Sequence, residues 1–207
     1  MRTIKEPETR KNEIIDVAER LFAYKGYDAA TINDILTEVN IAKGTFYYYF
    51  KSKEDILDAI VRRRNDLNME RAEAIAAMAE LGPKEKLLAI IMSQKPQNPL
   101  QKDFNAVIHE PENSKLHQKV LVDCVQRLSP IMCRVVEEGI GQGIFNTHFP
   151  KQCVEILLTS AIILFDDAYF QWEPDEMAAK IPAFLNAMER ILGAGEGSLS
   201  EFTNAFG

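Results

Sequence analysis

The sequence has only three cysteines, and their number and spacing exclude the sites that cysteine usually supports. Cys124, Cys133 and Cys153 are odd in number, and no two of them form a CxxC pair. A disulfide framework or a zinc site with cysteine ligands is therefore not expected, and we predict no metal site and no cofactor. We interpret the three side chains as reduced thiols in the core of a cytoplasmic protein.

Long apolar runs are also missing. The longest, residues 156–165, is interrupted by Thr159 and Ser160. It reaches about half of the roughly 20 residues that a membrane-spanning helix needs. The opening residues, MRTIKEPETR, contain no apolar segment of the kind that directs secretion. We therefore expect a cytoplasmic protein that does not enter a membrane.

The sequence patterns of common enzymes are absent as well. There is no nucleophile–base arrangement, no HExxH, no glycine-rich phosphate loop and no Glu-x-x-His pair. We expect no catalytic residues, and an enzyme is the less favoured of the functional classes considered.

Charge is present but is divided unevenly along the 207 residues. The net charge of −7 at first sight argues against binding to nucleic acid. Residues 1–65, however, contain 12 Lys and Arg against 11 Asp and Glu, whereas residues 66–207 contain 12 against 20. A near-neutral N-terminal part followed by an acidic remainder is compatible with DNA binding by the N-terminal part alone.

Apolar residues recur at helical spacing over almost the whole chain, and no segment alternates as a strand would. The sequence therefore predicts an all-α protein, and 46% hydrophobic residues are enough to bury its core. The last residues, 194–207, are rich in Gly and Ser and predict a flexible tail. About nine helices are expected, at residues 7–24, 32–39, 42–50, 53–80, 84–94, 102–109, 114–140, 151–171 and 174–192.

The first 50 residues predict a helix-turn-helix, in which three short helices follow one another and a very short turn joins the last two. In the third helix, Phe46 and Phe50 can both face the core. Tyr47 and Tyr48 must then point largely outward, because consecutive residues cannot share one helix face. Exposed hydroxyls and flat rings beside lysines suit phosphate oxygens and thymine methyl groups. The alternative is an ordinary helical hairpin with a tyrosine-rich surface.

Three further positions favour DNA binding. Gly44 lowers helix propensity by about 1 kcal/mol, which a close approach of the backbone to DNA would justify. Thr31 is a good N-cap for the second helix. Thr31 and Lys53 both lie at helix N-termini, where free N–H groups and the helix dipole favour a phosphate.

The run TINDILTEVNIAKGTFYYYFKSKEDIL, which begins at Thr31, resembles the signature of the TetR (tetracycline-repressor-like) family of regulators, and the similarity covers about residues 9–60. The resemblance implies a DNA-binding domain at 8–66, with its helix-turn-helix at about 31–50, and a helical regulatory and dimerisation domain at 67–193. Asn40 stands where the family usually has Gly, and Asn tolerates the left-handed conformation. The family usually has His at Tyr48 or Tyr49, which bears on base preference. Positions that match the family's operator contacts are Thr31, Lys43, Gly44, Thr45, Tyr47, Tyr48 and Lys53.

The expected helix at 151–171 indicates a homodimer on physical grounds. The apolar residues 156–158 and 161–165 are distributed around the whole circumference, so the helix must be covered on both sides. One side can face its own core and the other needs a partner subunit. Together with the amphipathic helix at 174–192, two copies would form a four-helix interface about a two-fold axis. The residues expected there are Ile156, Ile162, Ile163, Phe184 and Met188.

The resemblance further implies a small-molecule effector that releases the repressor from a palindromic operator. An apolar effector is expected from Met92, Phe104, Leu121, Phe165 and Trp172, and Asp166 would additionally favour a cationic one. His109 and His117 could act as a pair only if the loop at Pro111 folds back. An effector-independent DNA-binding regulator or recruiting protein is the alternative. For each pocket candidate the alternative is plain core packing; the candidates are Met92, Phe104, His109, His117, Leu121, Cys124, Phe165, Asp166 and Trp172.

Overall fold

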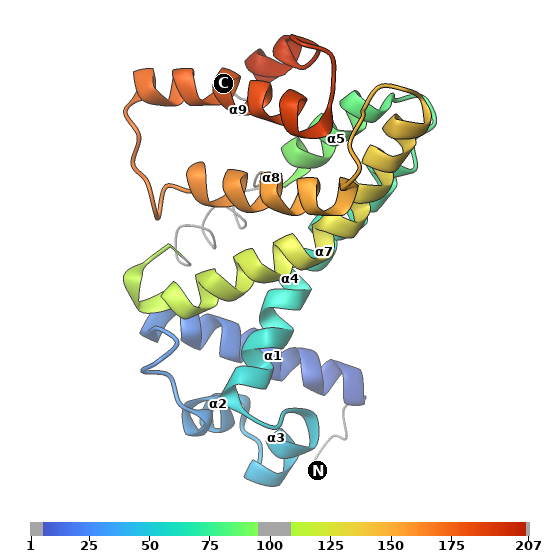
Figure 1. Ribbon diagram of the computed structural model, residues 1–207. Helices are drawn as coiled ribbons and strands as arrows, with labels where there is room; N and C mark the ends of the chain where they lie inside the picture. Colours follow the sequence, from blue (N-terminus) through green and yellow to red (C-terminus); the bar gives the residue numbers. More distant parts are fainter. Residues whose placement is uncertain (1–5, 95–108, 206–207) are drawn as a thin grey trace. The chain divides into compact units, whose positions relative to one another are not determined.

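The computed structural model describes residues 6–94 and 109–205, and its regular structure in these residues is entirely helical (Figure 1). The expectation of an all-α protein is confirmed. The helix expected at 102–109 lies, except for its last residue, outside the described residues. The chain forms two compact units. Unit 1 comprises residues 1–65 and 98–123, and unit 2 comprises residues 66–97 and 124–207.

Unit 1 contains α1 (Pro7–Lys25), α2 (Ile32–Val39), α3 (Lys43–Tyr49), the first half of α4 (Lys53–Ala76) and the start of α7 (Ser114–Gly141). Their apolar faces meet in one cluster, whose most deeply buried side chains include Ile14, Phe22, Ile35, Phe46, Leu57 and Leu116. Leu116 belongs to α7, so a segment expected in the regulatory domain contributes to the core behind the helix-turn-helix.

Local signals set the helix ends in unit 1. Gly26, with φ of 82°, follows α1 in a conformation that L side chains rarely adopt. The Thr31 hydroxyl caps α2 by accepting the amide N–H of Asp34 at 3.1 Å. Asn40 ends α2 in the left-handed conformation, with φ of 56°. The expected N-cap and the expected tolerance of Asn40 are both confirmed.

Unit 2 contains the second half of α4, α5 (Pro83–Ser93), the remainder of α7, α8 (Pro150–Leu164), α9 (Pro174–Leu192) and a 3₁₀ helix, η2 (Ser200–Ala205). Two ion pairs within this unit join α7 to α4. Arg127 on α7 pairs with Asp66 at 2.6 Å, and Arg134 on α7 pairs with Glu73. The core of the unit includes Ile90, Leu128, Val136, Phe145, Val154, Leu158 and Leu192.

Two helices end earlier than expected. α4 stops at Ala76 rather than 80, and α8 stops at Leu164 rather than 171. The indole N–H of Trp172 donates to the Leu164 carbonyl at 2.8 Å, which satisfies a carbonyl that a longer helix would have used. The carboxylate of Asp166 accepts the amide N–H of Ala168 at 2.8 Å, so this residue begins a turn and does not lie within a helix.

The C-terminal segment differs from the flexible tail that its composition predicted. The carboxylate of Glu189 on α9 accepts the amide N–H groups of Gly197, at 2.9 Å, and Leu199, at 2.6 Å. Leu199 is buried in the core of unit 2. These two hydrogen bonds, which glycine and serine content cannot reveal, hold the segment against α9. None of the helices in the described residues has the length and apolar character needed to cross a membrane.

Candidate nucleic-acid interface

α3 has one buried face and one open face. Phe46 and Phe50 are fully buried in the core of unit 1, as predicted. On the other face Tyr47 is 45% exposed and Tyr48 is 77% exposed. The ammonium of Lys43 lies 5.9 Å from the centroid of the Tyr47 ring. The open face therefore offers two phenol hydroxyls, two aromatic faces and one cation, and Thr45 lies half-buried beside them.

The N-terminus of α2 is occupied by the protein's own carboxylate. Asp34 accepts the Thr31 amide N–H at 2.8 Å and the Thr31 hydroxyl at 2.9 Å. The backbone N–H of Thr31, with the ammonium of Lys25, lowers the pKa of Asp34 to about 2. Thr31 is thus a capping residue with its hydroxyl engaged inside the protein. The Thr-x-x-Asp spacing could have indicated this capping box from the sequence alone.

Gly44 lies on the open face, in the first turn of α3. A Cβ atom built there would meet no other atom of the protein within 4 Å. Glycine costs about 1 kcal/mol relative to alanine within a helix. The described residues leave open space where a side chain would stand, so packing does not explain the glycine, and a close approach by DNA would do so.

We expect the substitution Gly44→Ala to change stability and DNA binding in opposite directions. The free energy of unfolding should rise by about 0.4–1 kcal/mol, because alanine favours the helix. Operator affinity should fall at least tenfold, because the new methyl group would enter the space needed by the DNA backbone. Chemical denaturation and fluorescence anisotropy with labelled operator would measure the two effects.

Gly141, at the end of α7, is the matched control, because a Cβ atom there also meets nothing within 4 Å. Gly141→Ala should leave operator affinity unchanged. Native operator affinity in Gly44→Ala would show that DNA does not approach α3 at this position.

Lys53 does not present its ammonium in the way that the sequence suggested. The ammonium donates to the carbonyl oxygens of Tyr27, Ala30 and Asp28, at 2.6, 2.9 and 3.3 Å. Burial lowers the pKa of Lys53. Lys51, two residues earlier, is exposed. The cation available next to α3 on this side is therefore Lys51, which the sequence reasoning missed.

The expected effector residues are divided between the units. His109, His117 and Leu121 belong to unit 1, and Phe104 lies outside the described residues. The 3₁₀ turn η1 (Pro111–Asn113) folds the chain back, and the rings of His109 and His117 lie 4.8 Å apart. His117 is buried. The remaining candidates belong to unit 2: Met92, Cys124, Phe165, Asp166 and Trp172.

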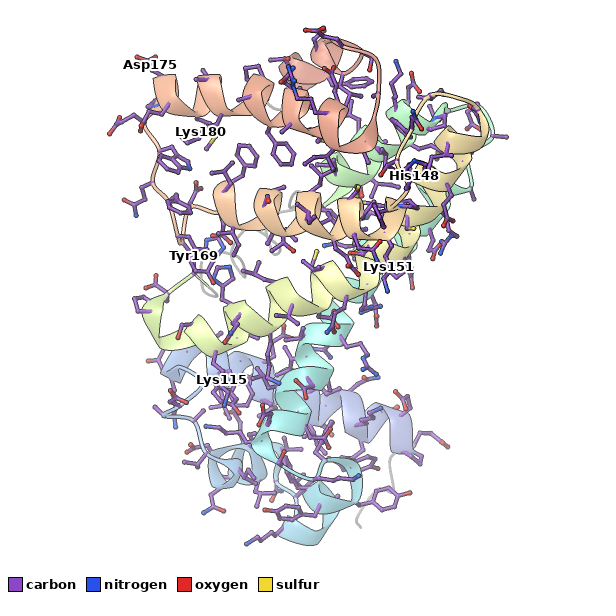
Figure 2. The ribbon with its side chains drawn as sticks, in the orientation of Figure 1. Lys115, His148, Lys151, Tyr169, Asp175 and Lys180 are labelled. Atoms are coloured by element: carbon purple, nitrogen blue, oxygen red, sulfur yellow. The ribbon has the colours of Figure 1, made fainter. Side chains whose placement is uncertain are left out.

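Aromatic side chains of unit 2 gather where the α8–α9 loop meets α9. The Trp172 ring stacks on Phe170, with centroids 4.9 Å apart. The Lys180 ammonium lies 3.6 Å from the centroid of Trp172. Lys180 on α9 and Tyr169 in the loop mark this region in Figure 2. Trp172 therefore already has a cation on its ring, which a cationic effector would have to displace.

The expected dimer residues differ in how much surface they leave for a partner. Ile156 on α8 is 56% exposed. Ile162, Ile163 and Phe184 are half-buried, and Phe184 packs edge-on against Phe165. Met188 is buried in the core of unit 2, so it has no surface left for a second subunit. The apolar stripe of α9 could not by itself separate core positions from interface positions.

Comparison with known proteins places both parts of the chain in one family. Residues 14–60 match the family model described as bacterial regulatory proteins of the tetR family. Residues 97–187 match the tetracyclin repressor-like C-terminal domain.

Individual relatives agree with this assignment. The HTH-type transcriptional repressor KstR2 of Mycolicibacterium smegmatis is 27% identical over 148 residues, which are 70% of this chain and 71% of that protein. The fatty acid metabolism regulator protein of Bacillus subtilis is 26% identical over 199 residues, covering 93% of this chain and 98% of that protein. A solved TetR/AcrR regulator from Thermobifida fusca is 28% identical, with a TM-score of 0.55, and the match covers 89% of this chain and 95% of that one. The chain belongs to the tetR family of bacterial regulatory proteins and is a DNA-binding transcriptional regulator.

Proposed function

We propose that this regulator is a repressor that binds a palindromic operator as a homodimer and leaves it when a small molecule binds. The observation that carries the proposal is the open face of α3, where Lys43, Tyr47 and Tyr48 stand out from a helix that is fixed by Phe46 and Phe50. Two of its relatives are named as a repressor and as a regulator of fatty acid metabolism. A repressor acts where its operator lies, so we place the protein in the cytoplasm.

The contacts with DNA would be divided by chemistry. Thr45 and Tyr48 would reach base edges in the major groove, as side chains of a recognition helix do. Lys43 and the hydroxyl of Tyr47 would bind phosphate oxygens, and Gly44 would let the backbone approach the DNA. Thr31 would act mainly through the cap that it provides for α2.

Dimerisation would use α8 and α9. Ile156 is an exposed β-branched side chain in the middle of α8. Ile163 lies seven residues further on the same helix face, with the exposed Thr159 and Ser160 between them, and Ile162 and Ile163 are half-buried. A two-fold pairing of these helices would leave both helix-turn-helix motifs available. Their spacing must then match half-sites about 34–36 Å apart, or a multiple of this distance.

The effector would be an apolar compound that acts through α4. α4 runs without interruption from Lys53 to Ala76, and its two halves belong to different units. A ligand that shifts α4 would change the spacing of the two recognition helices. An acyl chain is a suitable apolar ligand class, because the Bacillus subtilis relative is named for fatty acid metabolism.

The test is to measure the linkage between the two ligands. Saturated fatty acids of increasing chain length, and a cationic amphiphile as a second probe, are screened by thermal shift, because a true ligand raises the melting temperature by mass action. A ligand found in this way is titrated with and without operator DNA, whose sequence is sought as an inverted repeat beside the gene. The coupling should be about 1–3 kcal/mol, and operator should weaken effector binding by the same factor.

The same measurement decides between the proposal and a regulator without an effector. Equal effector affinity in the presence and absence of operator would rule out release by this mechanism. Specific operator binding together with no stabilising compound would favour an effector-independent regulator or recruiting protein.

A further inference from the structure

Lys53, the first residue of α4, has all its donors directed into the protein. An ammonium has three N–H donors, and three backbone carbonyls lie within reach, at 2.6 Å (Tyr27), 2.9 Å (Ala30) and 3.3 Å (Asp28). The ammonium also lies 4.2 Å from the centroid of the Tyr27 ring. The number of donors equals the number of acceptors, so no donor remains for a DNA phosphate.

These contacts stabilise the ammonium of Lys53 at a helix N-terminus, where a cation is otherwise unfavourable. The N-terminus of a helix carries partial positive charge, and a cation there is repelled rather than stabilised. Three carbonyl dipoles of the α1–α2 loop supply the negative end that the helix terminus lacks. Burial lowers the pKa of Lys53, with Lys115 acting in the same direction and Asp28 in the opposite one. The carbonyls therefore hold the side chain in place, and the Asp28 carboxylate attracts it as well.

The loop that Lys53 holds leads directly into the helix-turn-helix. Tyr27 and Ala30 are buried, and Thr31 follows as the N-cap of α2. Lys53 itself follows Phe50, the C-cap of α3, by three residues. One side chain thus connects the entrance of α2 to the exit of α3 across a sequence separation of 26 residues.

A second cation reaches the same tyrosine from α7. The ammonium of Lys115, labelled in Figure 2, lies 5.1 Å from the centroid of the Tyr27 ring. Lys119, one turn further along α7, pairs with Asp58 at 2.5 Å and Glu54 at 3.1 Å on α4. The hydrogen bond from Lys119 lowers the pKa of Glu54, so this carboxylate stays ionised to a lower pH than that of an unpaired glutamate. The loop at 27–30 is therefore packed between the first turns of α4 and α7 within unit 1.

We propose that Lys53 is a positioning residue, which sets the orientation of α2 and α3 through the loop at 27–30 and does not bind a DNA phosphate. The exposed lysines, Lys43 and Lys51, provide the cations for phosphate instead. This inference rests on DNA binding through α3, as proposed above. The positioning role of Lys53 and DNA binding through α3 can be refuted independently, because variants of Lys43, Lys51 and Lys53 are measured in one assay.

Arginine at position 53 distinguishes the two roles. A guanidinium keeps the charge, but its donors lie in one plane as a rigid fork, whereas the ammonium of lysine directs its three donors to three separate carbonyls. Arginine binds phosphate at least as well as lysine does. Lys53→Arg should therefore preserve a phosphate contact and disrupt a positioning contact.

The experiment measures binding of operator and of random DNA between about 50 and 200 mM salt for Lys53→Met, Lys53→Arg, Lys51→Met and Lys43→Met. We expect both Lys53 variants to lose at least tenfold in operator affinity at temperatures well below their melting temperatures. Their salt slope should stay unchanged and their preference for operator over random DNA should fall. Lys51→Met and Lys43→Met should each reduce the salt slope by about 1 on both DNAs. Hydrogen exchange at the amides of Ala30 and Asp34 should accelerate in the Lys53 variants and not in Lys51→Met.

Two results would overturn the inference. A Lys53→Met variant with a salt slope reduced by about 1, together with native binding by Lys53→Arg, would make Lys53 a phosphate contact. Native operator affinity in folded Lys53→Met with a lower melting temperature would make it a stabilising residue without a role in orientation. If Lys53→Met does not fold, Lys53→Arg decides, because only the positioning role predicts a loss of operator preference with full charge retained. Normal salt slopes in Lys43→Met and Lys51→Met would instead count against the proposed α3 interface.

Discussion

Replacing Lys43, Tyr47 and Tyr48 together with alanine is expected to lower operator affinity by a factor of roughly 10²–10⁶. Each well-placed contact of a recognition helix is worth about 1–3 kcal/mol, and three such contacts are removed. Stability should change little, because the three side chains are exposed and α3 is held by the buried Phe46 and Phe50, with the partly buried Tyr49 packed against the same core. Fluorescence anisotropy with a labelled operator duplex measures the affinity, and circular dichroism verifies the fold.

The chain offers a matched control for this variant. Tyr24, near the end of α1, is 88% exposed and lies outside α3. Tyr24→Ala removes a comparable exposed ring and should leave operator affinity within a factor of about three, since surface substitutions usually change free energies by less than about 0.5 kcal/mol. Unchanged operator affinity in the triple variant would show that DNA is bound elsewhere on the protein.

Replacing Ile156 with glutamate is expected to raise the dissociation constant of the dimer by more than about 100-fold. The side chain would be buried between subunits in the proposed interface, and an unpaired charge buried there costs about 3–5 kcal/mol. Operator affinity should fall as well, because a monomer engages one half-site at a time. Sedimentation velocity at several protein concentrations measures the first effect and anisotropy the second.

Leu67 on α4 is the matched control, since its 54% exposure is close to that of Ile156 and both residues lie in unit 2. Leu67→Glu should leave the oligomeric state unchanged. Sedimentation of the unmodified protein as a stable monomer at micromolar concentration would refute the proposed dimer. A dimer retained in Ile156→Glu would mean that the subunits meet through another surface.

Helix boundaries were predicted well where both ends carry a local signal. The expected helix at 32–39 is α2, which starts after the Thr31 cap and ends at the left-handed Asn40. The expected helix at 174–192 is α9, with proline in its first turn and Gly193 at its end with φ of 66°. The expected helix at 151–171 continues seven residues beyond the observed end of α8 at Leu164. Helical periodicity cannot reveal the hydrogen bond from the Trp172 indole to the Leu164 carbonyl that accompanies this end.

The faces of α3 were also predictable. Burial of Phe46 and Phe50 with exposure of Tyr47 and Tyr48 follows from a repeat of 3.6 residues and from the need to bury the most apolar side chains. The burial of Met188 was not predictable in the same way. The apolar stripe of a helix does not show which of its residues lie in the core of the same subunit and which contact a partner subunit.

The sequence by itself determined the features that depend on neighbours within about one helical turn: the all-α class, the capped helix-turn-helix and the tyrosines on its open face. It also determined the family, because the residues that carry the family signature are contiguous. Only the tertiary structure decided the orientation of Lys53, which turns to carbonyls 23–26 residues earlier in the chain. It likewise decided that Leu116 of α7 belongs to the core behind the helix-turn-helix and that the Glu189 carboxylate accepts the amide N–H groups of Gly197 and Leu199. Such contacts depend on which distant segments meet, and that choice results from packing the whole chain rather than from the pattern of any one segment.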